Sequence, residues 1–147
     1  MAVFIMQLLM GSILIDPPVN SAVTIPGKNG VWWALVIELI IAFITMSMVL
    51  FTSNNDKLKK HTRIFAGCLV CTWVIVAGPI SGFGMNPARS LASALPANIW
   101  TAFWIYLFVP VAGMLVAAEI YLFVESKSKL KSQRSKMELL EPLEFLL

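Results

Sequence analysis

Charged residues are scarce in this sequence. Asp, Glu, Lys and Arg make up 13% of its 147 residues, whereas a soluble domain usually has about 25%. Hydrophobic residues make up 59%. A chain of this composition cannot cover its outside with polar groups, which argues against a soluble globule, a disordered chain and a nucleic-acid-binding protein. The composition instead indicates a protein that lies in a membrane.

Cysteine and histidine are scarcer still, with two Cys and one His. Two cysteines cannot form the disulfide framework of a small secreted protein. Cys68 and Cys71 lie within an apolar run, and we interpret them as small packing residues. The single histidine, His61, provides little material for a metal cluster, and no pair of nucleophile and base stands out. We therefore expect no metal, no cofactor and no catalytic residue, and a membrane enzyme is the least favoured function.

The Lys and Arg residues fall into two clusters, and only Lys28 and Arg89 lie elsewhere. The clusters are Lys57, Lys59, Lys60 and Arg63, and then Lys127, Lys129, Lys131, Arg134 and Lys136. Two apolar runs separate them, so both lie on one side of a membrane if both runs cross it. The positive-inside rule makes that side the cytoplasm. The pattern predicts a multi-pass protein of the cell membrane, with residues 125–147 as a basic cytoplasmic tail.

The apolar runs predict an all-α membrane protein with about three full crossings, at residues 31–52, 64–80 and 99–124. The first would be about 33 Å long as a helix, against about 30 Å of hydrocarbon. Residues 2–15 are also apolar but would reach only about 21 Å, so we expect a partial helix there. Residues 16–30 contain Pro, Gly and Asn turn signals and are predicted to form an outer loop.

Glu38 lies inside the first full crossing. A carboxylate at membrane depth is expensive, so it should face protein or water rather than lipid. We favour a structural buried acid, protonated or hydrogen-bonded, over a direct role in transport, because buried charge must be paired.

The segment 81–96 does not fit a simple bundle of crossings. Both its flanks lie on the outer side by the charge argument, so it must leave and return there. Asn86 followed by Pro87 predicts a helix start, because Asn caps helices and Pro is preferred at the first helical position. Pro96 would end this helix after about 14 Å, which is half a bilayer. We predict a re-entrant half-helix with Arg89 one turn inside it, rather than an ordinary outer loop with a surface arginine.

These residues resemble the second half of an aquaporin, of the major intrinsic protein family. The motif is Asn86, Pro87, Ala88, Arg89 and Ser90, preceded by Gly82, Phe83, Gly84 and Met85. An acid within a crossing, a basic inner loop and a crossing that ends in Gly-Pro give it the expected context. The resemblance covers about residues 4–124 and does not include the tail.

The resemblance implies six crossings built as two inverted halves, each with one Asn-Pro-Ala half-helix. This chain has one such motif, so we expect a truncated aquaporin-like fold in residues 1–124 that lacks the first half. The resemblance implies a passive channel for water or small neutral solutes such as glycerol, working in the bilayer with another aquaporin half or as a homo-oligomer, a tetramer in the family. The alternative is a non-conducting fragment that associates with other channel subunits.

The resemblance also assigns roles to residues. The pore motif would be Asn86, Pro87 and Ala88, and the backbone of Gly82, Gly84 and Met85 would line the pore. The family's spacing places its selectivity filter at Arg89, Phe83 and Val74, with Val70 and Cys71 as a possible pore wall. Selectivity in aquaporin-type pores depends on pore width, hydrogen-bonding groups and an arginine. An apolar filter favours small neutral solutes, whereas Ser90, Ala94 and Tyr106 resemble the water channels, so both solutes stay open.

Overall fold

The computed structural model describes residues 2–14, 16, 17 and 19–144, and every regular element in them is helical, which confirms the predicted all-α fold class. The α-helices are α1 (Ala2–Met10), α2 (Val31–Ser53), α3 (Thr62–Val76), α4 (Gly78–Ser81), α5 (Pro87–Ala97) and α6 (Phe103–Glu144). Short 3₁₀ helices cover Gly11–Leu14, Asn20–Ala22 and Lys59–His61.

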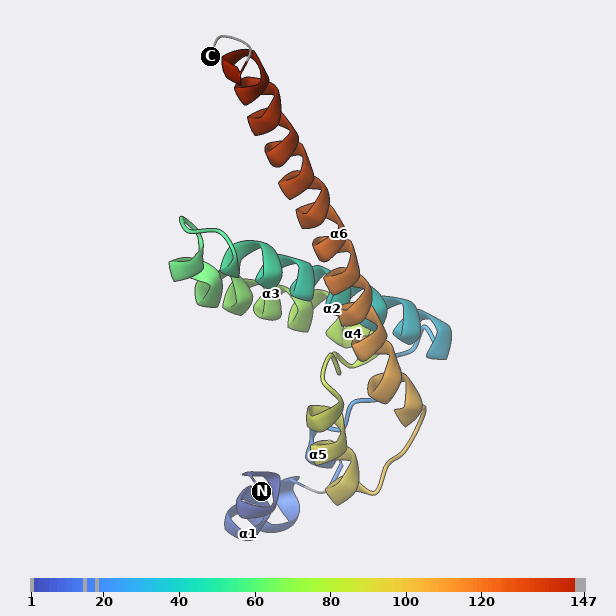
Figure 1. The fold of residues 1–147 in the computed structure, drawn as a ribbon. Helices are drawn as coiled ribbons and strands as arrows, with labels where there is room; N and C mark the ends of the chain where they lie inside the picture. The colour runs from blue at the N-terminus through green and yellow to red at the C-terminus, as the bar shows by residue number, and fades with distance from the viewer. Residues whose placement is uncertain (1, 15, 18, 145–147) are drawn as a thin grey trace.

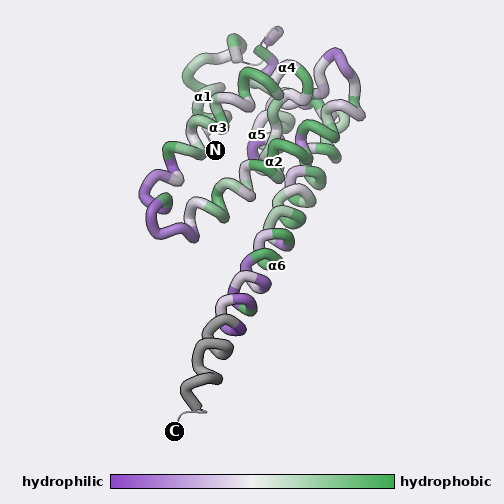
Figure 2. Tube along the Cα trace, turned by 90° about the horizontal axis from the view of Figure 1, so that it is seen from above, coloured by the Kyte–Doolittle hydropathy of each residue, from purple (hydrophilic) through white to green (hydrophobic). Residues whose placement is uncertain are grey.

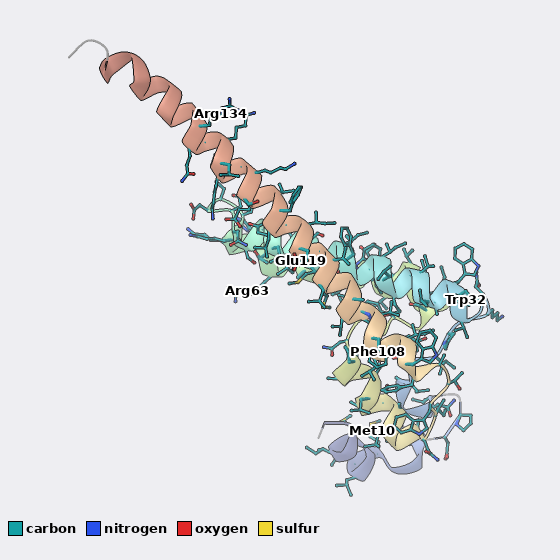
Figure 3. The ribbon with its side chains drawn as sticks, turned by 45° about the vertical axis from the view of Figure 1, so that its right-hand side comes forward. Met10, Trp32, Arg63, Phe108, Glu119 and Arg134 are labelled. Carbon is teal, nitrogen blue, oxygen red and sulfur yellow. The ribbon has the colours of Figure 1, made fainter. Side chains whose placement is uncertain are left out.

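Two helices are long and apolar enough to cross a membrane, α2 over Val31–Ser53 and α6 over Phe103–Arg134. These two helices cross each other and share the largest contact between elements in the described chain (Figure 1). Many of their large apolar side chains are exposed, among them Trp32 and Phe108 (Figure 3). An apolar surface of this extent needs lipid or another protein to cover it.

The crossing predicted over 64–80 is divided at Ala77, where α3 gives way to the short helix α4. Ala77 itself keeps helical angles, φ −88° and ψ −27°, and α3 lies beside α2 (Figure 1). The Gly78-Pro79 pair gives the reason for the division, because Pro79 has no N–H to donate to the preceding turn. The two pieces together would extend about 30 Å as one helix, which is enough to reach across the hydrocarbon.

The last helix does not end with its apolar run but continues to Glu144. Residues 125–144 contain no glycine and are rich in Glu, Lys and Leu, which favour helix. The predicted tail is therefore an extension of α6 in the described residues, and residues 145–147 lie outside them. Figure 2 shows the hydrophilic part of this extension and the hydrophilic loop between α2 and α3 beyond the apolar stretches of the helices.

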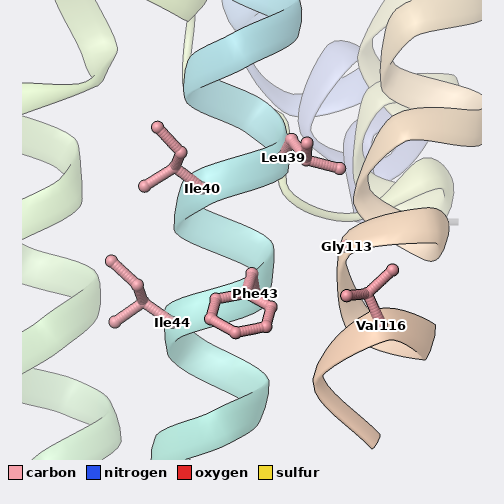
Figure 4. Close-up of a pocket in the computed structure, with 6 residues that line it drawn as sticks. All are labelled: Leu39, Ile40, Phe43, Ile44, Gly113 and Val116. Carbon is pink, nitrogen blue, oxygen red and sulfur yellow. The ribbon is translucent and has the colours of Figure 1, made fainter. Parts of the chain in front are cut away.

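Gly113 lets α6 lie directly against α2. A Cβ at this position would stand 2.7 Å from the carbonyl oxygen of Leu39 and 3.2 Å from the Cβ of Ala42. Small residues at helix crossings allow this close approach of backbones in membranes. Beside the contact, the two helices leave an apolar hollow lined by Leu39, Ile40, Phe43, Ile44, Gly113 and Val116 (Figure 4).

We predict that Gly113→Leu destabilises the α2–α6 crossing by about 1–3 kcal/mol, the usual cost of overpacking. The backbone of Leu39 cannot move aside as a flexible side chain would. Detergent-induced unfolding in mixed micelles measures the loss. Ala112→Leu is the matched control, because Ala112 is the neighbouring position on α6 and is exposed. Equal stability of the two variants would contradict the assigned contact.

Candidate functional site

Glu38 is the hydrogen-bond acceptor around which the re-entrant segment is arranged. Its side chain on α2 is fully buried. One carboxyl oxygen, Oε1, accepts hydrogen bonds from the hydroxyl of Ser81 and the N–H of Gly84, both at 2.8 Å. The other, Oε2, accepts from the N–H of Met85 at 2.6 Å. An acid that would be costly in hydrocarbon is thus fully provided with donors, and these donors come from the segment between α4 and α5.

Ser81 and Tyr106 complete this buried network. The Ser81 hydroxyl accepts from the N–H of Phe83 at 3.2 Å. The Tyr106 hydroxyl donates to the carbonyl oxygen of Ser81 at 2.6 Å, and both residues are buried. The end of α4 is therefore tied to α2 through Glu38 and to α6 through Tyr106. The sequence did not identify Ser81 as part of the site, although a tyrosine within an apolar run usually has a partner for its hydroxyl.

Residues 82–86, the irregular segment before α5 that we call the re-entrant strand, have an unusual backbone. Phe83 and Met85 both have φ of 53°, in the left-handed region that costs a residue with a side chain about 1–3 kcal/mol. The N–H groups of Gly84 and Met85 point at Glu38 in this conformation. Gly84 must lack a side chain, because a Cβ there would stand 2.5 Å from the Tyr106 ring. The carboxylate bonds hold a conformation that the sequence of the strand would not adopt alone.

The outer loop closes over the same segment. Gly27 donates its N–H to the carbonyl oxygen of Ile80 at 2.9 Å. A Cβ on Gly27 would stand 2.1 Å from the carbonyl oxygen of Pro79, and one on Gly82 would stand 2.5 Å from that of Ile25. Sequence reasoning treated residues 16–30 only as a turn-rich loop. The close approach of backbones explains why glycine occupies position 27.

Asn86 starts α5 as an N-cap, with extended angles and its Oδ1 accepting from the N–H of Ala88 at 2.9 Å. Pro87 is the first helical residue. In the described residues the Nδ2 of the exposed Asn86 makes no hydrogen bond, so it is available as a donor. The helix passes Pro96 by one residue and ends with Asn98 in the left-handed conformation.

Two of the predicted filter residues contact each other. The Arg89 guanidinium donates to the carbonyl oxygen of Phe83 and lies over the Phe83 ring, 4.9 Å from its centroid. Phe83 is only 7% exposed and packs with Ile41 and Ala77. Arg89 is therefore fixed to the strand that precedes its own helix, by a charge-assisted hydrogen bond and a cation–π contact.

The third predicted filter residue lies apart from these two. Val74, Val70 and Cys71 are exposed on α3 at helical spacing, so they share one side of that helix. Trp73, the neighbour of Val74, packs against the cluster that contains Phe83, and its indole N–H donates to Thr45 at 3.1 Å. Within the described chain α3 and α5 make no extensive contact.

The strand carbonyls predicted to line a pore are not equivalent. The oxygen of Phe83 accepts from Arg89, and that of Gly84 accepts from the N–H of Asn86 at 2.6 Å. Among the described residues no donor reaches the carbonyl oxygens of Gly82 and Met85. These two acceptors and the Asn86 amide are the polar groups that an oxygen-bearing solute could bind.

Comparison with known proteins identifies the family of this chain. The sequence profile of the family described as "Major intrinsic protein" matches residues 1–121. The chain belongs to the major intrinsic protein family. This match confirms the resemblance found in the sequence, and two helices that can span a membrane fit a family of integral membrane proteins. Members of this family are channels rather than enzymes.

Plant proteins of the family are similar to this chain over much of its length. A protein of Nicotiana alata described as "Probable aquaporin NIP-type" is 34% identical over 86% of this chain and 50% of its own length. "Aquaporin NIP2-2" of Zea mays is 37% identical over 63% of this chain and 32% of its own length. "Aquaporin NIP6-1" of Arabidopsis thaliana is 32% identical over 75% of this chain and 36% of its own length. The chain thus spans half or less of the length of these relatives.

We predict that Glu38→Gln loosens the re-entrant strand. In a glutamine the amide NH₂ replaces one of the two carboxyl oxygens and therefore faces at least one group that now donates to Glu38. That donor loses its acceptor while it stays buried, at a cost of about 1–3 kcal/mol. Hydrogen exchange should become faster at the N–H groups of Gly84 and Met85, with little change in the middle of α2. Glu119→Gln, an exposed acid on α6, is the control. Unchanged exchange in the Glu38 variant would refute its organising role.

Proposed function

We propose that this chain forms one half of a passive channel for water or small neutral solutes. The observation that carries the proposal is the exposed start of α5, where Asn86 keeps a free amide donor while Glu38 holds the strand behind it. A side-chain amide donor beside backbone carbonyl acceptors, with no nucleophile among them, fits transient binding of an oxygen-bearing solute better than chemistry on it.

The proposed path combines three elements of the site. A solute oxygen accepts from Asn86 and its hydroxyl donates to the carbonyls of Gly82 or Met85, so that each molecule has polar partners in turn. The positive end of the α5 dipole and the Arg89 guanidinium face the same path and oppose the passage of cations. Apolar side chains such as Val74 on α3 form the opposite wall and keep binding weak enough for release.

The proposed solutes include both water and small polyols such as glycerol. An apolar filter built from Val74 and the region of Phe83, with Arg89 as its single charge, accommodates a carbon backbone as well as its hydroxyl groups. The similar plant proteins carry the name aquaporin, which supports water as a solute.

The proposed placement puts both basic clusters in the cytoplasm. The end of α2, with Phe51 and Asn54, and residues 121–128 of α6 line one common hollow, so the polar loop and the α6 extension leave the bundle at the same end. Exposed tryptophans, Trp32 near the start of α2 and Trp104 near the start of α6, lie at the other end. Tryptophan belts of this kind mark a membrane interface.

The proposed pore needs a facing surface. Asn86, Ala88 and Arg89 are exposed on α5, and polar groups exposed to hydrocarbon cost several kcal/mol each. In the proposal either another aquaporin half or a further copy of this chain covers them, in a tetramer by family resemblance. The same exposure supports the second candidate function, a non-conducting subunit that only associates with other channels.

Stopped-flow light scattering of proteoliposomes separates the two functions. We expect the chain alone to raise neither water nor glycerol permeability, and the chain reconstituted with the part of the Nicotiana relative that it does not match to raise at least one. An assembly that forms, judged by co-purification, but conducts nothing would favour the non-conducting subunit. Rapid permeation through the chain alone would require a different arrangement of copies.

In a conducting assembly, Arg89→Val should increase the leak of protons or cations, because it removes a permanently charged group from the path. A pH-sensitive dye inside the liposomes, with a membrane potential applied, measures the leak. Arg63→Val, which removes an arginine from the first turn of α3 instead, is the control. If both variants conduct solute normally and leak equally little, Arg89 is not a barrier.

A further inference from the structure

We propose that the inner end of the α2–α6 crossing binds the headgroup of an anionic phospholipid. The hollow at this end has a volume of about 250 Å³ and is lined by Phe51, Asn54, Asn55, Tyr121, Val124, Glu125 and Ser128. It lies where the apolar run of each helix ends, which is the depth of lipid headgroups.

The lining changes character along the hollow. Phe51 and Val124 form an apolar part and are both exposed, as a surface that meets acyl chains would be. The Asn54 amide donates one N–H to the carbonyl oxygen of Leu50 at 2.9 Å, and its second N–H and the Ser128 hydroxyl can bond to phosphate or ester oxygens. The combination suits an amphiphile lying along α6 rather than a purely aqueous ion.

The charge around the hollow is strongly positive. Residues 54–63 and 121–131 contain seven Lys and Arg against two acids. Both acids already pair with lysines, Asp56 with Lys59 at 2.7 Å and Glu125 with Lys129 at 2.8 Å. The acid that lines the hollow therefore does not present an uncompensated negative charge to a ligand. A surplus of five positive charges remains at one membrane boundary, and clusters of this kind attract anionic lipid.

Three lysines in the two segments next to the hollow have no partner within the described residues. In the described residues the ammonium groups of Lys57, Lys60 and Lys131 form neither an ion pair nor a ring contact. Lys127 lies over the ring of Phe123 at 4.5 Å instead. Lysines without an acid partner keep their full attraction for phosphate, so their removal tests the electrostatic part of the proposal.

The test uses the full chain in phosphatidylcholine vesicles with spin-labelled phosphatidylserine or spin-labelled phosphatidylcholine as the probe. Electron paramagnetic resonance gives the fraction of probe that the protein immobilises. We expect the serine lipid to associate at least about fivefold more strongly, which one lysine near an anionic headgroup can supply. A triple variant should abolish most of this preference; it combines Lys57→Gln, Lys60→Gln and Lys131→Gln. The same three positions changed to Arg, and Lys28→Gln in the outer loop, should keep it.

A second variant tests the hollow itself. Ser128→Trp fills the hollow without changing charge and should lower the preference at least threefold, whereas Ser126→Trp, two residues earlier on α6 and outside the hollow, should not. This variant also decides the outcome if the triple Gln variant does not insert. The proposal is overturned if the protein shows no preference for the serine lipid. It is also overturned if the triple Gln variant lowers the preference but Ser128→Trp does not, or if inorganic phosphate competes fully with the lipid.

Discussion

The buried carboxylate of Glu38 is the interaction on which the rest of the site depends. It binds the N–H groups of two consecutive residues and the hydroxyl of Ser81, and so holds a strand whose Phe83 and Met85 lie in an unfavourable backbone region. Three hydrogen bonds to this buried acid offset strain of this size, because breaking one would leave a buried donor unsatisfied at a cost of about 1–3 kcal/mol. The exposed amide of Asn86 and the carbonyls next to it take their positions from this anchor.

Membrane burial makes the anchor decisive. In water the strand could exchange each lost hydrogen bond for one with solvent, but in hydrocarbon irregular backbone must find its partners within protein. Glu38, Tyr106 and the backbone of the outer loop supply these partners from three separate parts of the chain. These parts of the chain can approach one another so closely only because positions 27 and 84 are glycines. A side chain at either position would displace backbone or a ring.

Much of the fold could be predicted from the sequence because the membrane imposes simple rules. Length, apolar character and the position of Lys and Arg were enough for the helices α2 and α6, and Asn86 followed by Pro87 was enough for the start of α5. The division at Ala77 and the helical extension after residue 124 depend on local backbone effects that an apolar run does not reveal.

The partners within the site were harder to predict. Nothing in the sequence pairs Glu38 with Gly84, which lies 46 positions away, or Gly27 with Ile80, since backbone donors have no sequence signature. The motif did place Arg89 near its strand, but its contact with Phe83 depends on a left-handed φ that a phenylalanine rarely adopts. Long-range hydrogen bonds to backbone groups are therefore the part of the site that the sequence does not predict.

The unbroken course of α6 has a consequence for how its parts are related. One helix carries the Tyr106 bond to the site, the close contact at Gly113 and the basic residues beyond 124. With 3.6 residues in each turn, these features keep a fixed angular phase about one axis. A single residue inserted after Val124 would rotate everything beyond it by about 100° relative to the side of the helix that carries Tyr106. The number of residues between Tyr106 and the basic residues therefore sets both their distance along α6 and the angle between them about its axis.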